Sequence, residues 1–170
     1  MSTQQAPSLA GTRWRVDPAH SSVGFAVKNF WGMTTVKGGF SRYHGTLDLS
    51  ADPAIELTLE GDSLDTRNKR RNKHLRSPTY FDVASHPYVR FVSESAVLDG
   101  EVLAVSGRLH ARGTSIPLHL RATLRGTGDA LEIDAVTQAD HRELGMTFSF
   151  LGAIGATSEL HVKGRLVPDS

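Results

Sequence analysis

The sequence predicts an all-β domain of antiparallel strands, and two features of the residue pattern indicate this. Apolar and polar residues alternate strictly over several runs, which is typical of strands with one buried face. Short turns rich in glycine, aspartate and proline separate these runs, so consecutive strands are expected to pair as a meander. Eight or more such strands can bury their apolar faces by closing into a barrel or by folding as a sandwich.

The clearest alternation covers residues 116–125, in which every second residue is apolar. The same pattern predicts strands at residues 23–27, 55–60 and 159–166. Turn pairs such as Asp99-Gly100 mark where one strand ends and the next begins. Further strands are expected at residues 34–40, 43–49, 88–95, 102–110, 131–139 and 146–151.

One segment does not alternate and predicts a short helix at residues 67–76. It has no β-branched residue, Asp65 or Thr66 precedes it as a potential N-cap, and Pro78 follows its end. Six of its ten residues are basic, and no acidic residue lies between Thr66 and Phe81. These cations either form a solvated helix face or bind an anionic group such as a lipid phosphate.

Composition excludes several classes of function. The 170 residues include no cysteine, which rules out disulfides, thiolate catalysis and iron–sulfur clusters. The formal net charge is only +1, and outside the basic helix 13 basic residues face 18 acidic ones. Most of the surface would therefore repel a polyanion, and we expect no nucleic-acid partner.

The chain is long enough for one domain, which we expect at residues 12–168 after a disordered tail at residues 1–11. No run approaches the length of a transmembrane helix, so no integral membrane segment is predicted. The first residues do not resemble a signal peptide, and the expected location is cytoplasmic.

Neither a metal site nor a catalytic motif is evident. His110, His119 and His161 share the polar face of their strands, so they are expected to point outward on separate strands. The sequence has no G-x-S-x-G elbow and no P-loop. We therefore predict no metal, no cofactor and no catalytic residues, although catalytic groups can also converge from distant strands.

Small residues at inward positions favour a hollow interior. Gly107, Ala122 and Gly164 lie on the apolar side of their strands, where larger residues would fill a core. A barrel of eight strands is either packed with side chains or holds one ligand. The pattern thus favours a cavity without excluding a filled core.

A series of short motifs runs through the chain in a fixed order. These motifs are Trp14-x-x-Asp17-x-x-His20-Ser21, Gly38-x-Phe40, Gly45-Thr46-Leu47, Ser63-x-Asp65-Thr66, His74-Leu75-Arg76-Ser77, Tyr80-Phe81-Asp82, Phe91-x-Ser93, Gly107-x-Leu109-x-Ala111-Arg112-Gly113-Thr114 and Arg142-Glu143-Leu144-Gly145. Together they resemble the YceI-like family, the lipocalin-like polyisoprenoid-binding proteins. The likeness covers about residues 12–167 in order and departs from the family at Asn29, Asn72 and Leu144.

This resemblance implies an antiparallel eight-stranded lipocalin-like β-barrel with one short helix near residues 67–76. It also implies that the barrel binds and carries a long-chain apolar lipid, a polyisoprenoid or fatty-acid derivative, in its lumen. His74 and Arg76 would then contact the headgroup at the barrel mouth. The residues predicted to line the lumen are Phe25, Val27, Phe30, Phe40, Leu59, Leu75, Phe81, Phe91, Leu109, Leu118, Leu120 and Phe148.

Two other functions remain open at this stage. The barrel could be an enzyme that acts on a lipid-like substrate, which would show as turnover when lipids are added. Alternatively, the basic helix could dock an acidic partner, and that binding would be sensitive to salt. The sequence also leaves a homodimer open.

Overall fold

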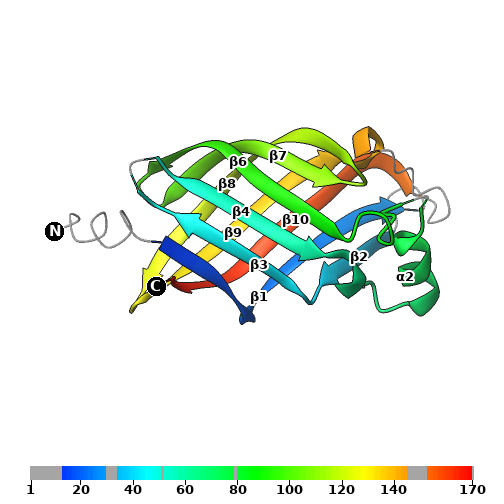
Figure 1. Ribbon diagram of the computed structural model, residues 1–170, viewed down its shortest axis with the longest axis horizontal. Helices are drawn as coiled ribbons and strands as arrows, with labels where there is room; N and C mark the ends of the chain where they lie inside the picture. The colour runs from blue at the N-terminus through cyan, green and yellow to red at the C-terminus, as the bar shows by residue number, and fades with distance from the viewer. Residues whose placement is uncertain (1–12, 30–33, 51, 79, 145–152, 170) are drawn as a thin grey trace.

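Eight antiparallel strands close into a barrel in the computed structural model, which describes residues 13–29, 34–50, 52–78, 80–144 and 153–169 (Figure 1). The ring closes where the first strand pairs with the last. This confirms the eight-stranded barrel that the sequence and its resemblance predict. The ring strands are β1 (Arg13–Asn29), β3 (Tyr43–Asp48), β4 (Ala54–Glu60), β6 (Tyr88–Asp99), β7 (Val102–Ala111), β8 (Thr114–Thr127), β9 (Ala130–Asp140) and β10 (Ala153–Pro168).

Strand β1 is long enough to pair with three other strands. Its first residues pair with β3, its later residues pair with β2 (Thr34–Phe40), and β10 lies along its other edge. Strand β2 also pairs with the short strand β5 (Leu64–Asp65), so these two strands extend one side of the barrel beyond the ring. A shift of register between Asp17 and Ser22 bends β1 midway between its two partners.

The bend of β1 is held by a local pair of side chains. Asp17 lies 2.7 Å from His20 Nδ1 through one carboxylate oxygen, and its other oxygen accepts a bond from the Ala19 amide. These contacts hold the pKa of Asp17 below its usual value, with the His20 hydrogen bond as the largest cause. Just after this pair, the Ser21 hydroxyl oxygen accepts a hydrogen bond from the Arg165 amide and so ties β1 to β10.

The alternation of residues places most of the strands, with differences in their extent. Strand β2 has the predicted bounds, whereas β6 continues four residues beyond the prediction, to Asp99. Strand β1 starts at Arg13, well before the predicted residues 23–27, and the two-residue strand β5 was not predicted. The strand expected at residues 146–151 lies outside the described residues. Between β7 and β8 the chain turns through Arg112 and Gly113, both with positive φ (55° and 72°), as a type I′ hairpin requires.

The single predicted helix is confirmed, but it begins two residues later than expected. Helix α2 covers Lys69–Arg76, and its N-cap is Asn68, whose side chain accepts a hydrogen bond from the Arg71 amide. Neither Asp65 nor Thr66 is the cap, because Arg67 adopts a left-handed conformation (φ 62°) that the helix cannot include. Two further short helical turns, η3 (Gly61–Ser63) and η4 (His141–Leu144), flank β5 and β9.

A buried polar network anchors α2 to β5. Asn72 Oδ1 accepts hydrogen bonds from the Thr66 amide and hydroxyl, and Asn72 Nδ2 donates to Asp65. Arg71 donates to the Thr66 carbonyl at 2.9 Å. Because each of these polar groups has a partner, burying Asn72 costs little free energy and fixes the orientation of the helix.

Candidate functional site

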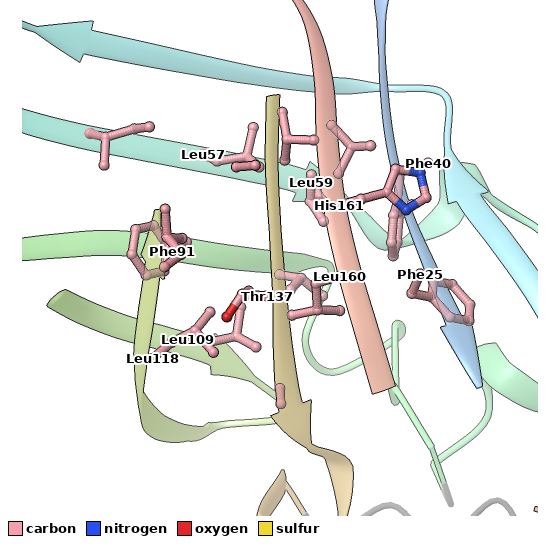
Figure 2. A pocket seen from close by; sticks show the side chains of 18 of the residues that line it. Phe25, Phe40, Leu57, Leu59, Phe91, Leu109, Leu118, Thr137, Leu160 and His161 are labelled. Carbon is pink, nitrogen blue, oxygen red and sulfur yellow. The ribbon is translucent and has the colours of Figure 1, made fainter. Parts of the chain in front are cut away.

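An apolar cavity of about 150 Å³ lies inside the barrel (Figure 2). All eight ring strands contribute to its wall, together with β2, η4 and the segment that follows α2. The principal apolar lining residues are Val16, Val23, Phe25, Phe40, Leu47, Ile55, Leu57, Leu59, Phe81, Val89, Phe91, Leu109, Ala111, Leu118, Leu120, Ala122, Ile133, Ala135, Ala139, Leu144, Leu160, Val162 and Leu166.

The alternation of each strand explains why the wall is apolar. On β8, Leu118, Leu120 and Ala122 line the cavity, whereas the intervening His119 and Arg121 are exposed. Ala122 lies directly opposite Ala135 on β9, and two small side chains at one level leave unfilled space. The cavity is thus a direct result of the side-chain sizes on the inward face.

The two glycines predicted to create space do not do so. A Cβ on Gly107 would lie 2.7 Å from the ring of Phe91, and one on Gly164 would overlap the side chain of Ser21. Each glycine therefore makes room for a neighbouring side chain instead of leaving a void. Of the three small residues singled out in the sequence, Ala122 is the one that lines the cavity.

Two of the polar residues that border the cavity, Thr137 and Glu56, use their polar groups in contacts with other parts of the barrel. The Thr137 hydroxyl donates a 2.7 Å hydrogen bond to the His119 carbonyl, so its methyl group is left for the interior. Glu56 forms an ion pair with Arg90, and both side chains are about half exposed. Since hydrocarbon dominates the wall, the site solvates apolar groups and offers no charge to a ligand.

His161 is less exposed than the other two histidines that were expected to face outward. His110 and His119 are exposed as predicted, whereas His161 is half-buried and borders the cavity from an outward register position on β10 (Figure 2). It pairs with Gly24 across the β1–β10 contact, and a Cβ on Gly24 would lie 2.8 Å from the imidazole. Because Gly24 has no side chain, the ring packs against the backbone of β1.

No group of three metal-ligating side chains occurs in the described residues, so the structure offers no metal centre there.

Three aromatic rings line the cavity towards α2. The ring centroids of Phe25, Phe40 and Phe81 lie 6.1 to 6.4 Å apart, at the tilted and edge-to-face angles that aromatic pairs favour. Phe81 belongs to the loop after α2, and its amide donates a hydrogen bond to the carbonyl of Leu75 in the helix. This cluster thus connects the cavity wall to the helix.

The arginine at the β7–β8 turn joins the segments around this same end. Arg112 donates one hydrogen bond to the Pro78 carbonyl, after α2, and another to the Leu144 carbonyl, in η4. Leu144 itself lines the cavity. A side chain on one hairpin therefore holds two neighbouring loops in place.

Eight of the twelve residues predicted to line the lumen border the cavity: Phe25, Phe40, Leu59, Phe81, Phe91, Leu109, Leu118 and Leu120. Val27 and Leu75 are buried in the core but do not border it. Phe30 and Phe148 lie outside the described residues. The prediction omitted Leu57, Leu160 and Val162, although each lies on the apolar side of an alternating strand and could have been found by that signal.

The two residues predicted at the mouth, His74 and Arg76, do not border the cavity. Arg76 donates hydrogen bonds to the carbonyls of Leu64 and Asp62, which fastens α2 to the segment around β5. His74 is exposed on the helix. Contact between either residue and a lipid headgroup remains a prediction.

Comparison with known proteins identifies the family. The model of the YceI-like domain matches residues 14–166, which is nearly the whole barrel. The chain belongs to the YceI-like family. Protein YceI of Salmonella arizonae and its counterpart in Salmonella paratyphi B are each 32% identical to it over 129 residues. Those matches cover 72% of this chain and 66% of each relative's own length.

Solved structures share the YceI-like barrel at low sequence identity. BcnA of Burkholderia cenocepacia is 18% identical, with a TM-score of 0.80 over 88% of this chain and 98% of its own. A polyisoprenoid binding domain from Saccharophagus degradans is 12% identical, with a TM-score of 0.73 over 93% of this chain and 99% of its own. These likenesses show the fold, and they agree with the resemblance seen in the motifs.

In the described part of the chain, no helix has the length and apolar character needed to cross a membrane.

Proposed function

We propose that this YceI-like barrel binds a long-chain apolar lipid, a polyisoprenoid or fatty-acid derivative, in its cavity and carries it. The observation that carries the proposal is the wall itself, to which all eight ring strands contribute apolar side chains. The polyisoprenoid-binding description of the Saccharophagus degradans domain supports the same ligand class.

The free energy of binding would come from burying hydrocarbon. Each CH₂ group removed from water contributes about 0.8 kcal/mol, so five buried CH₂ groups give about 4 kcal/mol before the entropy cost of ordering the tail. An apolar cavity of about this volume is known to stay dry and to bind a hydrocarbon ring. The cavity therefore suits a lipid tail and would select tails by width and length.

A longer tail would have to pass between the rings of Phe25, Phe40 and Phe81. These side chains contact one another without hydrogen bonds, so rotation of a ring costs only dispersion contacts. The headgroup would then lie outside the wall, on the side where α2 is found. In the proposed complex, the apolar tail lies inside the barrel and the polar headgroup lies outside it.

A binding role fits the cavity better than catalysis on a lipid-like substrate. Glu56 and His161 are titratable and border the cavity, but both occupy outward register positions on their strands. The Asp17–His20 pair holds the bend of β1, and neither side chain of that pair is buried. Turnover of a lipid incubated with the protein would contradict this part of the proposal.

Mass spectrometry of an organic extract of the natively purified protein tests the proposal directly. We expect a long-chain isoprenoid or acyl species in a fixed ratio to protein. A second assay measures uptake of cis-parinaric acid, a fluorescent polyene fatty acid, in solution. A protein that is extracted empty and takes up neither this probe nor a polyprenyl lipid would contradict the proposal.

Matched variants separate the cavity from the outer wall. Leu120→Asp places a charge on a cavity-lining position of β8, and Val136→Asp places the same charge on an outward position of β9 that is 54% exposed. We expect the first change to abolish probe uptake and the second to leave it unchanged. Ala135→Phe, which fills the cavity without a charge, should also reduce uptake in a folded barrel.

A further inference from the structure

The two ends of the barrel carry opposite charge. Helix α2 lies at one end, and the first residues of β1 and the last residues of β10 lie at the other (Figure 1). The basic residues of α2 and the preceding Arg67 place six cations beside two carboxylates in residues 61–76. The opposite end, where β3, β6 and β8 turn back, has more carboxylates than cations. Arg13 lies there beside Asp48, and Arg125 pairs with Glu132 on the neighbouring strand. The carboxylates of this end are Asp48, Asp52, Asp99, Glu101, Asp129 and Asp169.

Three cations of α2 are exposed to solvent and do not hold the helix to the barrel. Arg71 and Arg76 donate hydrogen bonds to the carbonyls of Thr66 and Leu64, and so they hold the helix in place. The remaining helix cations, Lys69, Arg70 and Lys73, are exposed. In the described part of the chain they form no ion pair.

Carboxylates near α2 do not neutralise this surface. Asp65 accepts hydrogen bonds from Asn72 and from the Arg67 amide, and the Arg67 charge also helps to lower its pKa. Asp82 lies 4.0 Å from His86. Exposed acidic residues at this end include Asp62 and Glu143, on η3 and η4. The exposed part of α2 is thus locally cationic while the protein as a whole has a net charge near zero.

Loops contribute to the cavity wall at the basic end. Phe81 and Leu144, from the loops around α2, border the cavity, whereas Leu103, Leu124 and Leu131 at the acidic end are at most 1% exposed and do not border it. Because a loop can move aside more readily than a paired strand, the passage of a lipid tail is placed at the basic end.

We propose that the exposed cations of α2 dock this end of the barrel on an anionic bilayer surface, from which the lipid is taken up or to which it is delivered. This inference rests on the proposed function. Long-tailed lipids reside in bilayers, and an anionic bilayer attracts Lys and Arg within about a Debye length. The same surface repels the acidic end, so the charge distribution orients the barrel with its passage towards the bilayer.

Vesicle flotation with the full chain tests the docking surface. Vesicles of phosphatidylcholine mixed with phosphatidylglycerol are compared with vesicles of phosphatidylcholine alone. We expect binding to the anionic vesicles at low salt and its loss at high salt. The variant Lys69→Gln/Arg70→Gln/Lys73→Gln should weaken binding by about a hundredfold, since each surface cation contributes about a fivefold factor.

A matched variant controls for net charge. Arg121→Gln/Arg125→Gln/Lys163→Gln removes the same three charges from exposed positions on β8 and β10 and should bind anionic vesicles almost as well as the wild type. If the helix variant loses its fold, as judged by circular dichroism, Arg70→Gln/Lys73→Gln replaces it, with an expected loss of about twenty-fivefold.

Four results would overturn the docking proposal. These are equal binding to neutral vesicles, unchanged binding by the helix variant, an equal loss in the control variant, and no binding by the wild type. In the last case, binding of polyglutamate or single-stranded DNA would assign the surface to another partner class.

Uptake of cis-parinaric acid without vesicles separates this proposal from the proposed function. The helix variant should take up the probe as the wild type does. Vesicle binding without uptake of the probe would support the docking surface and contradict only the proposed lipid ligand. Uptake of the probe without vesicle binding would contradict only the docking surface.

Discussion

Two regions of this barrel differ in how they bury apolar side chains. Near the first residues of β1 and the last residues of β10, Leu103 and Leu124 are fully buried against neighbouring side chains. Farther along the barrel, Phe25, Leu120 and Leu160 face a cavity instead. Both regions use the same alternating strands, so alternation alone does not decide whether an interior is filled. Side-chain size at facing positions decides it, as Ala122 opposite Ala135 illustrates.

The largest expected difference between the two regions is in the cost of truncating a leucine. Leu124→Ala in the filled region should lower the free energy of unfolding by about 4 kcal/mol, because it removes a fully packed side chain. Leu120→Ala at the cavity should cost about 1–2 kcal/mol, since that side chain already lacks neighbours on one side. Urea unfolding measures both, and equal losses would contradict the distinction.

The next effect concerns the attachment of α2. Asn72→Ala should lower stability by about 2–3 kcal/mol, because it leaves the buried Thr66 amide and hydroxyl without their partner. Amide hydrogen exchange should show faster exchange in α2 and β5 and little change in β8. Asn68→Ala, which removes only the exposed helix cap, is the control and should cost about 1 kcal/mol. Exchange that rises uniformly over the barrel would show that α2 is not separately anchored.

A smaller effect is expected at the β7–β8 turn. Arg112→Asn keeps a residue that tolerates positive φ but removes the hydrogen bonds to Pro78 and Leu144, and it should cost about 1–2 kcal/mol. If these bonds hold the loops at the cavity end, release of cis-parinaric acid should also become faster. Arg125→Asn, on β8, should change neither rate nor stability. Stopped-flow fluorescence with unchanged release in both variants would limit Arg112 to a structural role.

The smallest effect is the response to acid. The pKa of Asp65 lies below its usual 3.8, chiefly because Asn72 donates a hydrogen bond to the carboxylate. A lowered pKa means that the folded state favours the charged form, so its stabilisation is present above about pH 4 and is lost as the pH falls further. Asp65→Asn should therefore flatten the fall of stability below about pH 4. Urea midpoints measured over that interval test this, and an unchanged slope would contradict it.

Local sequence located most strands but not their full extent, and it placed the helix less well. Strand β2 has the bounds that alternation predicts, because the polarity of each residue indicates which face of the sheet it occupies. The first part of β1, residues 13–22, contains the bend at Asp17, which interrupts the alternation. Helix α2 starts later than its residue preferences indicate, because Arg67 takes a left-handed conformation while Asp65 and Thr66 bind Asn72. Asn72 lies six and seven residues from these two partners, and the helix propensity of a single residue does not include contacts at that distance.

The cavity wall was partly predictable and its polar neighbours were not. Inward positions such as Phe91 and Leu118 follow from alternation. The environment of Gly164 depends on Ser21, and that of His161 depends on Gly24, in both cases a residue from the opposite end of the chain. Such contacts arise only when β10 pairs with β1, so no local pattern contains them.

The pairing of β1 with β10 also has a consequence for the order of events during synthesis. Val23 lies opposite Val162 and Phe25 opposite Leu160, so the apolar face of the first strand emerges from the ribosome long before its partner exists. Contacts this distant in sequence form slowly, and an unpaired apolar strand is prone to aggregate while it waits. The nascent chain should thus depend on chaperones until β10 has been made, and truncation within β10 should prevent folding of the entire barrel.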